Sequence, residues 1–320
     1  MSAKPPLHPT DIFIPGFMKS GTTALAGYLN LHPDISVSTP KEPGYFASDL
    51  MQESDRFHGR KLYFQTRTPQ QYEGIFDPSA KLRVDASTAY IYSNCAAEAI
   101  YQHNPKAKII ICIRDPVSFL ISLHQQYLNE TVETEADLAI AWRLEEDRKA
   151  GRYIPSRVRV PSYLFYRERL KYFKQIRRFL DTFPKDQIKL LLFDDFLADN
   201  QKEIAKIMEF IGLDMTENWP PRIESNSRRV PRNASLHRFI NSPTLKRTLY
   251  RVMGGRLYTR THKSLQGLMY QRRPRPNRVC LEFKEEVWRT CFDDVEQISK
   301  VIQRDLKILW GCPTKVYELQ

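Results

Sequence analysis

A short apolar run, followed by a glycine-bounded loop and a helical pattern, constrains the fold of this chain more than any other feature. The run DIFI at residues 11–14 has the character of a buried strand, and residues 22–31 repeat helix-forming residues at helical spacing. The loop between them begins at Gly16. Where a strand turns into a helix through such a loop, backbone N–H groups and the helix dipole bind anions. The sequence therefore predicts a phosphate-binding turn, with a purely structural turn as the alternative.

The loop differs at one position from that of ATP-hydrolysing proteins. Gly16 and Gly21 have the G-x4-G spacing of the P-loop, but Thr22 stands where that motif has its lysine. The cation lies inside the loop instead, at Lys19. A loop with this lysine and the hydroxyls of Thr22 and Thr23 suits one 5′-phosphate, with the ammonium beside a bridging oxygen. It is poorly equipped to span a magnesium triphosphate.

Further apolar segments, separated by helical patterns, define the fold class. The run KIIICI at residues 108–113 is continuous and β-branched, as in the buried centre of a parallel sheet. The other strands are expected at residues 11–14, 35–37, 82–85 and 188–193. Helices are expected at residues 22–31, at 69–76, from Pro116 onward, at 161–183, at 202–211 with a stop at Gly212, and at 283–310. This alternation predicts an α/β chain with a three-layer fold, in which helices flank a central parallel sheet.

A second group of polar residues follows the KIIICI strand. Arg114 stands where that strand ends, at the carboxyl edge where α/β sheets bind ligands. Ser122 lies eight residues further along, about two turns into the helix that begins near Pro116. A guanidinium and a hydroxyl in these places can bind a second phosphate, separate from the first. The spacing alone also fits an ordinary arginine and a surface serine, so its weight comes from the glycine loop that accompanies it.

Together these segments resemble the sulfotransferases that use 3′-phosphoadenosine 5′-phosphosulfate (PAPS). The similarity rests on GFMKSGTTAL at residues 16–25 and KIIICIRDPVSFLISLHQQY at residues 108–127, and it extends to the segments HPDIS, KEPGYF and SNSRRVPRNASL. It is greater to the heparan-sulfotransferase-like branch and its bacterial relatives than to the steroid and phenol branch, and it covers most of residues 11–236. The resemblance implies a P-loop-like fold, PAPS as co-substrate and PAP as the released nucleotide.

The resemblance also assigns roles to residues at matching positions. It implies that the loop binds the 5′-phosphosulfate, with Lys19 stabilising the departing phosphate, and that Arg114 and Ser122 bind the 3′-phosphate. Arg232, in the segment VPRN, resembles a basic residue that folds over the nucleotide. Nucleotide binding is thus expected at Lys19, Ser20, Gly21, Thr22, Thr23, Arg114, Ser122 and Arg232.

Two residues are candidates for the base that takes a proton from the acceptor. Glu42, in KEPGYF, aligns with the catalytic base of the heparan-type enzymes. Some heparan-type enzymes have a His four residues after the serine. In this chain that position is Gln126, and the nearest His, His124, is the second candidate. The alternatives are a Glu42 that only hydrogen-bonds its own turn and a His124 that packs on its helix. No metal is expected, because a sulfuryl group carries less charge than a γ-phosphate and the sequence offers no cluster of ligands.

The positive charge of the chain is concentrated in one segment. Of the net +12, residues 222–278 contribute +14 through thirteen Arg and two Lys against Glu224 alone, which leaves −2 for all other residues. Such a segment needs anions nearby, unless it is only a solvated face. Within a single sulfotransferase domain spanning residues 1–320, we expect residues 214–278 to form a basic loop and helix region that covers the nucleotide or the substrate. Residues 236–271 fit either a packed helix with a basic face or one resting on an anionic membrane.

Composition bounds the cellular setting and the acceptor. No apolar run approaches the roughly 20 residues of a membrane span, and the segment MSAKPPLHPT lacks the apolar core of a secretory signal. Five scattered Cys are typical of reduced thiols in an intracellular protein, with a Cys280–Cys291 disulfide as the alternative. We therefore expect a cytoplasmic enzyme that sulfates a hydroxyl or amine of a small molecule, such as a secondary metabolite. A lipid or carbohydrate acceptor at a membrane surface is the alternative.

Two other classes of function are weighed against sulfuryl transfer. A P-loop small-molecule kinase would need a magnesium-binding acid after a strand, for which Asp85 and Asp194 are the available residues, and Thr22 argues against it. A nucleic-acid-binding protein would use residues 222–278. That segment has no platform of interleaved aromatic residues and no recognised motif, so no nucleic-acid partner is expected.

Overall fold

The computed structural model describes residues 9–213, 229–231, 270–272 and 279–317. The chain forms two compact units, one of residues 1–223 with 279–320 and the other of residues 224–278. In the second unit the described residues form an antiparallel pair of strands, β6 (Arg229–Pro231) and β7 (Tyr270–Arg272). Arg232 and nearly all of the basic regions expected at 214–278 and 236–271 lie outside the described residues. The single-domain prediction for residues 1–320 stays a prediction.

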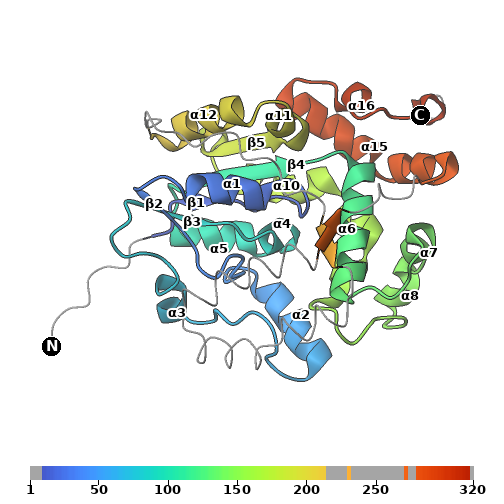
Figure 1. Ribbon diagram of the computed structural model, residues 1–320, viewed down its shortest axis with the longest axis horizontal. Helices are drawn as coiled ribbons and strands as arrows, with labels where there is room; N and C mark the ends of the chain where they lie inside the picture. Colours follow the sequence, from blue (N-terminus) through green and yellow to red (C-terminus); the bar gives the residue numbers. More distant parts are fainter. Residues whose placement is uncertain (1–8, 214–228, 232–269, 273–278, 318–320) are drawn as a thin grey trace. The chain divides into compact units, whose positions relative to one another are not determined.

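A five-stranded parallel sheet with the order β2-β3-β1-β4-β5 is the centre of the larger unit (Figure 1). Its strands are β1 (Ile12–Phe13), β2 (Ile35–Val37), β3 (Leu82–Asp85), β4 (Lys108–Ile113) and β5 (Ile188–Leu192). The strand β1 lies between β3 and β4, so the segments that follow these three strands meet at one edge of the sheet. Each strand coincides with one expected from the sequence, to within two residues at its ends.

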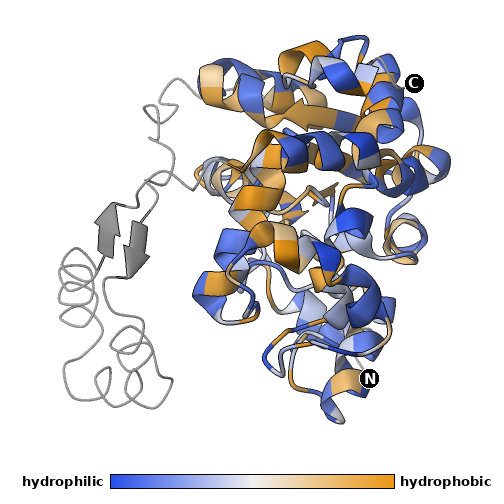
Figure 2. Cartoon of the chain, turned by 90° about the vertical axis from the view of Figure 1, so that its right-hand side faces the viewer, coloured by the Kyte–Doolittle hydropathy of each residue, from blue (hydrophilic) through white to orange (hydrophobic). Residues whose placement is uncertain are grey.

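Helices cover both faces of the sheet, because successive side chains of a strand point to opposite faces. In β4, Ile109 and Ile111 belong to one hydrophobic cluster, whereas Ile110 and Cys112 belong to a second. The second cluster is completed by α1 (Thr22–Leu29), α11 (Phe193–Ala198) and α12 (Asn200–Ile211), and the first by α5 (Ala96–His103), α6 (Pro116–Glu130), α10 (Tyr172–Thr182) and α15 (Leu281–Ile302). Figure 2 shows hydrophobic residues along the strands and residues of both kinds on the helices. The predicted three-layer α/β fold is confirmed.

The remaining helical segments lie between these elements or follow α15. They are α2 (Ser48–His58), α3 (Pro69–Glu73), α4 (Ala89–Tyr92), α7 (Leu138–Arg143), α8 (Glu145–Lys149), the 3-10 turn η1 (Pro161–Leu164), α9 (Tyr166–Arg169), the 3-10 turn η2 (Lys185–Gln187), α16 (Leu306–Leu309) and α17 (Thr314–Tyr317). The helix α2 follows a segment of irregular backbone after β2, and this segment carries Glu42.

Two long helices expected from the sequence are interrupted. Residues 161–183 contain η1, α9 and α10 in place of one helix. The backbone N–H groups of Phe173 and Lys174 donate to Asp294 on α15, so α10 starts anew at this point. Residues 283–310 are divided between α15 and α16, because Gln303 adopts a left-handed conformation and Asp305 caps the next helix.

Two expectations from composition can be compared with the structure. All five Cys are free thiols, as expected, and Cys280 is not paired with Cys291. Among the helices that the structure describes, none combines the length and the apolar character needed to cross a bilayer.

Candidate active site

The glycine loop joins β1 to α1 at the carboxyl edge of the sheet. Gly16 lies so close to β4 that a Cβ atom on it would stand 2.8 Å from the backbone nitrogen of Cys112. Gly21 has a φ of 90°, in the left-handed region that favours glycine, and directly precedes α1. The helix begins without a side-chain cap and without an acidic residue in its first turn. Its first N–H groups have no intrahelical acceptor, so they are available to an anion.

Lys19 is held in an unusual backbone conformation at the centre of this loop. Its φ of 62° is left-handed, which costs a non-glycine residue about 1–2 kcal/mol. Desolvation by the surrounding protein, and then the Arg114 guanidinium, lower the pKa of Lys19, whereas the Glu130 carboxylate acts in the opposite direction. Of the neighbouring loop residues, Ser20 is buried and donates to the carbonyl oxygen of Met18 at 3.4 Å. The pKa of the Lys19 ammonium is therefore changed by burial and by two neighbouring charged side chains.

Arg114 connects the two halves of the predicted phosphate site. It follows β4, and its Nη1 lies 2.8 Å from the carbonyl oxygen of Lys19 and 3.1 Å from Oγ of Ser122. The guanidinium also lies over the ring of Phe193, 4.8 Å from the ring centroid. Since Ser122 is on α6 and Lys19 precedes α1, one side chain links the segments that follow β1 and β4. The structure thus brings Lys19, Arg114 and Ser122 together at one edge of the sheet.

Glu42 reaches the same edge from the irregular segment between β2 and α2. Its Oε1 lies 2.8 Å from Nζ of Lys41, and its Oε2 accepts a hydrogen bond from Oγ1 of Thr88 at 3.0 Å. Like Lys19 it has a left-handed backbone, with a φ of 60°. The charges of Lys19 and Glu42 both act on the Glu130 carboxyl, which places the two candidate catalytic residues within electrostatic reach of one group. A carboxylate has about four lone-pair positions, so the two bonds leave capacity to accept another proton donor.

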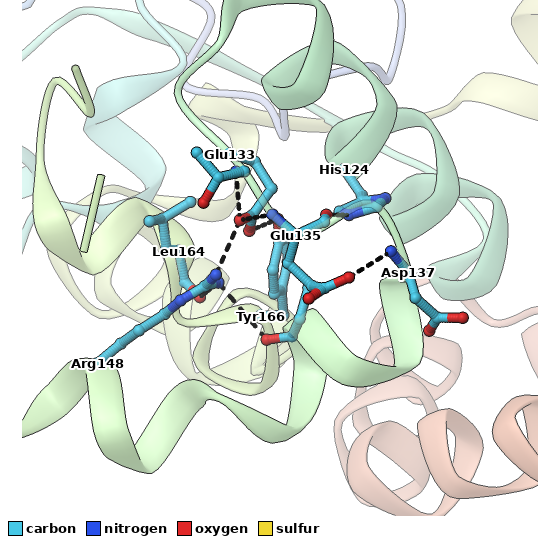
Figure 3. A network of polar contacts seen from close by, with 9 residues as sticks. His124, Glu133, Glu135, Asp137, Arg148, Leu164 and Tyr166 are labelled. Atoms are coloured by element: carbon cyan, nitrogen blue, oxygen red, sulfur yellow. Dashed lines mark hydrogen bonds and ion pairs between the residues drawn. The ribbon is translucent and has the colours of Figure 1, made fainter. Parts of the chain in front are cut away.

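His124 is placed differently from Glu42. Its side chain is buried on α6, and its Nε2 lies 2.8 Å from the backbone oxygen of Glu135 (Figure 3). Because a carbonyl oxygen only accepts, Nε2 carries the proton. Burial lowers the pKa of His124. Beside it, Glu133 forms a buried ion pair of 2.8 Å with Arg148 and accepts a hydrogen bond from Tyr166. His124 therefore links α6 to the loop that follows this helix.

The family model for the sulfotransferase domain matches residues 9–252 of this chain. The chain belongs to the sulfotransferase family. Among its relatives are the human heparan sulfate glucosamine 3-O-sulfotransferases 6 and 5, which are 25% and 27% identical to it over 201 and 215 residues. These matches cover 62% and 65% of this chain, and the chain spans about half the length of the relatives, 51% and 53%.

A solved structure has the same fold as this sulfotransferase family member. It is a sulfotransferase from Alicyclobacillus acidocaldarius, with a TM-score of 0.63 and 24% identity. The match covers 95% of this chain and 99% of that chain. The family and the P-loop-like fold implied by the sequence motifs are both confirmed.

Glu130 lies near the candidate site of this sulfotransferase family member, but the sequence motifs do not indicate it. Ser122, Gln126 and Glu130 follow one another at intervals of four on α6, so they lie on one face of the helix. Nε2 of Gln126 donates to Oε1 of Glu130 at 2.8 Å. The Glu130 carboxylate raises the pKa of Lys19, so it lies in reach of the loop. The four-residue spacing that continues from Ser122 to Glu130 is the sequence signal that points to this residue.

An aromatic cluster supports the glycine loop from within the core. The ring of Phe17 lies 4.2 Å from that of Tyr172, measured between centroids. Next to them the buried Arg169 guanidinium lies between Tyr92 and Tyr163, 3.5 Å and 4.3 Å from the two ring centroids. Rigid support of this kind keeps binding groups at fixed positions, as a site that acts through charge and orientation requires.

The two acids that a kinase would need are both engaged in hydrogen bonds with other side chains. Asp85 accepts hydrogen bonds from the hydroxyls of Ser87, Tyr90 and Tyr72. Asp194 accepts from Nε1 of Trp310 at 2.9 Å. Within the described ranges, no group of three or more His, Cys, Asp or Glu side chains is arranged to hold a metal ion.

Proposed function

We propose that this protein transfers the sulfuryl group of PAPS to a hydroxyl or amine of a small-molecule acceptor and releases PAP. The observation that supports this most directly is the position of Arg114, whose Nη1 contacts both the Lys19 carbonyl oxygen and Oγ of Ser122. A loop for one phosphate and an Arg–Ser pair for another are therefore neighbours at one edge of the sheet. A nucleotide with phosphates on both its 5′ and 3′ positions needs two such sites close together.

The residues present suit this nucleotide. Lys19, Ser20, Gly21, Thr22 and Thr23 would bind the 5′-phosphosulfate through the uncapped start of α1. Arg114 and Ser122 would bind the 3′-phosphate, because a guanidinium matches the geometry of phosphate oxygens. Arg232 is the further basic residue proposed for the nucleotide.

The chemistry assigned to this site is charge stabilisation and proton removal. The bond from sulfur to the 5′-phosphate oxygen breaks while a bond from the acceptor to sulfur forms, with the reacting atoms in line. By analogy with phosphoryl transfer the transition state is loose, so positioning and charge dominate. Lys19 neutralises the charge that develops on the leaving oxygen. Glu42 takes the proton of the acceptor, with His124 as the less favoured candidate because its Nε2 proton is bound to Glu135.

A carbohydrate hydroxyl is a second candidate acceptor. The named human relatives are sulfotransferases of the glucosamine 3-O position of heparan sulfate. An assay of PAP release over small-molecule alcohols, amines and oligosaccharides, with and without anionic vesicles, separates the two acceptor classes and the membrane-surface alternative. We propose that the protein acts in the cytoplasm. Secondary metabolites with a hydroxyl or amine are the first acceptors to be screened.

Replacing Arg114 tests the nucleotide assignment. We expect Arg114→Ala to weaken PAP binding by about 10- to 100-fold, because charge-assisted hydrogen bonds to the 3′-phosphate are lost. Binding of adenosine 5′-phosphosulfate, which lacks that phosphate, should change far less, and titration calorimetry measures both. Arg178→Ala is the matched control, since this guanidinium also bonds one side-chain oxygen and one backbone oxygen, at Asn94 and Ile91. Equal losses for both nucleotides would contradict the 3′-phosphate role.

Replacing Lys19 and Glu42 tests the chemistry. Lys19→Ala should lower kcat by about 10²- to 10³-fold. Glu42→Gln should lower kcat by about 10²- to 10⁴-fold and leave the Kd for PAP close to that of the parent. A Glu42→Gln enzyme that turns over normally would exclude Glu42 as the base.

A further inference from the structure

The segment that carries Glu42 depends on a few specific bonds for its position. Residues 39–47 have neither helix nor strand, and Glu42 and Gly44 both have left-handed backbones, with φ values of 60° and 65°. The N–H group of Gly44 donates to Oγ of Ser87 at 3.0 Å. Oε2 of Glu42 accepts from Oγ1 of Thr88 at 3.0 Å. The consecutive residues Ser87 and Thr88 thus bind the backbone and the Glu42 carboxylate of the same turn.

Asp85 sets the orientation of the Ser87 hydroxyl. Oγ of Ser87 donates to Oδ1 of Asp85 at 2.7 Å. A hydroxyl has one hydrogen, so this bond leaves Ser87 Oγ as an acceptor for the N–H group of Gly44. If the carboxylate were absent, the hydroxyl could rotate to another acceptor and the bond to Gly44 would lose its preferred geometry.

Asp85 is itself fixed by the sheet and by the core. It is the last residue of β3, and its backbone oxygen accepts from the N–H group of Ile14, next to β1. Its Oδ2 accepts from the hydroxyls of Tyr90 at 2.6 Å and Tyr72 at 3.0 Å, and the side chain is fully buried. Since β1 leads directly into the glycine loop, the Glu42 turn is tied to the same strand pair that places Lys19.

We propose that Asp85, Ser87 and Thr88 are positioning residues that hold Glu42 in register with the phosphate loop. The proposal rests on the function assigned to Glu42 above. These three residues act through Glu42 and Gly44 rather than on the substrate. Their loss moves the base relative to the acceptor, and a displacement of about 1 Å at a reacting group can cost about 10²-fold in rate.

A pair of variants separates positioning from general support of the fold. Ser87→Ala and Tyr72→Phe each remove one buried hydroxyl that donates to Asp85, but only the Ser87 hydroxyl also contacts the Glu42 turn. The Phe ring keeps the stacking of residue 72 on Tyr45, whose centroids are 4.6 Å apart. We expect Ser87→Ala to lower kcat by about 10- to 100-fold with little change in the KM for PAPS. Tyr72→Phe should lower kcat by less than about two-fold.

Thr88 gives a second test that does not depend on the stability of the Ser87 variant. Thr88→Val removes the hydroxyl that donates to Glu42 at nearly constant volume, and Thr88→Ser keeps it. We expect kcat to fall in the Val variant and to be restored to within about three-fold in the Ser variant, with the Kd for PAP unchanged in both.

The outcomes also separate this proposal from the proposed function. If Glu42→Gln is inactive while Ser87→Ala and Tyr72→Phe lower kcat equally, or Thr88→Val matches Thr88→Ser, the positioning role is overturned and Glu42 stays the base. If Glu42→Gln turns over normally, the base assignment is wrong and the positioning proposal falls with it.

Discussion

Burial and two charged neighbours determine the pKa of Lys19. Desolvation has the largest effect and lowers this pKa, the Arg114 guanidinium lowers it further, and the Glu130 carboxylate raises it. Under the proposed function the lysine must be an ammonium to neutralise the leaving oxygen, so its pKa would set the alkaline limit of activity. On this proposal the Glu130 carboxylate extends the active pH range to higher pH, because it raises the pKa of Lys19.

Removing the Glu130 charge should shift that limit. In Glu130→Gln the carboxylate that favours the ammonium is lost, so the pKa of Lys19 falls further and the alkaline limb of kcat/KM for PAPS moves to lower pH. The measurement is the pH profile of PAP release. Glu98→Gln is the matched control, because Glu98 lies on α5 and is also hydrogen-bonded to a glutamine four residues away, Gln102. A limb that shifts equally in both variants would argue against a charge effect at Lys19.

Some residues of the candidate site can be predicted from local spacing in the sequence, and others cannot, for a physical reason. Lys19, Arg114 and Ser122 stand at fixed offsets from strand ends, so local spacing reveals them. Ser87 and Thr88 contact the Glu42 turn across more than forty residues, through the bonds from Gly44 N–H to Ser87 Oγ and from Thr88 Oγ1 to Glu42 Oε2. Contacts of this kind depend on the arrangement of strands, which no local pattern contains. The buried position of His124 likewise depends on the backbone of Glu135, in the loop that follows α6.

At the scale of an element, the start of α6 links stability to the site. Asp115 caps this helix, and its carboxylate accepts from the N–H groups of Val117 at 3.3 Å and Ser118 at 2.8 Å. The cap follows Arg114 directly, and the same helix carries Ser122. The cap therefore fixes the angle at which both residues of the proposed 3′-phosphate site enter it.

Replacing the cap should affect both folding and binding. We expect Asp115→Ala to lower the free energy of unfolding by about 1 kcal/mol and to raise the Kd for PAP, whereas Asp115→Asn keeps most of the cap. Asp137→Ala is the control, since Asp137 caps α7 through the N–H groups of Ala139 and Ile140. It should lose stability without loss of PAP affinity. Denaturant unfolding and calorimetry measure the two effects, and equal PAP affinities for Asp115→Ala and Asp137→Ala would exclude the link.

The accuracy of the sequence prediction also differs between elements. The strand at residues 108–113 is found with its limits because a continuous β-branched run fits a strand buried on both faces. The helix expected at 161–183 is broken because Asp294, more than a hundred residues away, binds the N–H groups that begin α10. Amphipathic spacing reports which face of a segment is buried, but it does not report where a distant side chain ends or restarts a helix.

For the whole molecule, the uneven charge makes binding of any anion a weak criterion of function. Residues 222–278 carry +14 of a chain whose total is +12, so polyanions are attracted whatever the role of the site. Attraction to a polyanion through many exposed charges falls steeply with salt, because binding releases counterions. Binding of one nucleotide in a built site depends on salt much less, and this difference separates the function classes.

Thermal unfolding of the full chain with PAP, magnesium ATP and RNA at two salt concentrations applies this criterion. A ligand of the native state at a hundred times its Kd stabilises by about 2.7 kcal/mol. For a chain of 320 residues this raises Tm by about 4 °C, at about 1.5 °C per kcal/mol. We expect PAP to give the largest rise, nearly constant between low and high salt, and Arg114→Ala to remove most of it. Any rise with RNA should vanish at high salt, because it comes from the basic segment alone. A larger rise with magnesium ATP than with PAP would favour the kinase alternative, since only a site for two separate phosphates prefers the nucleotide that carries one on each side of its ribose.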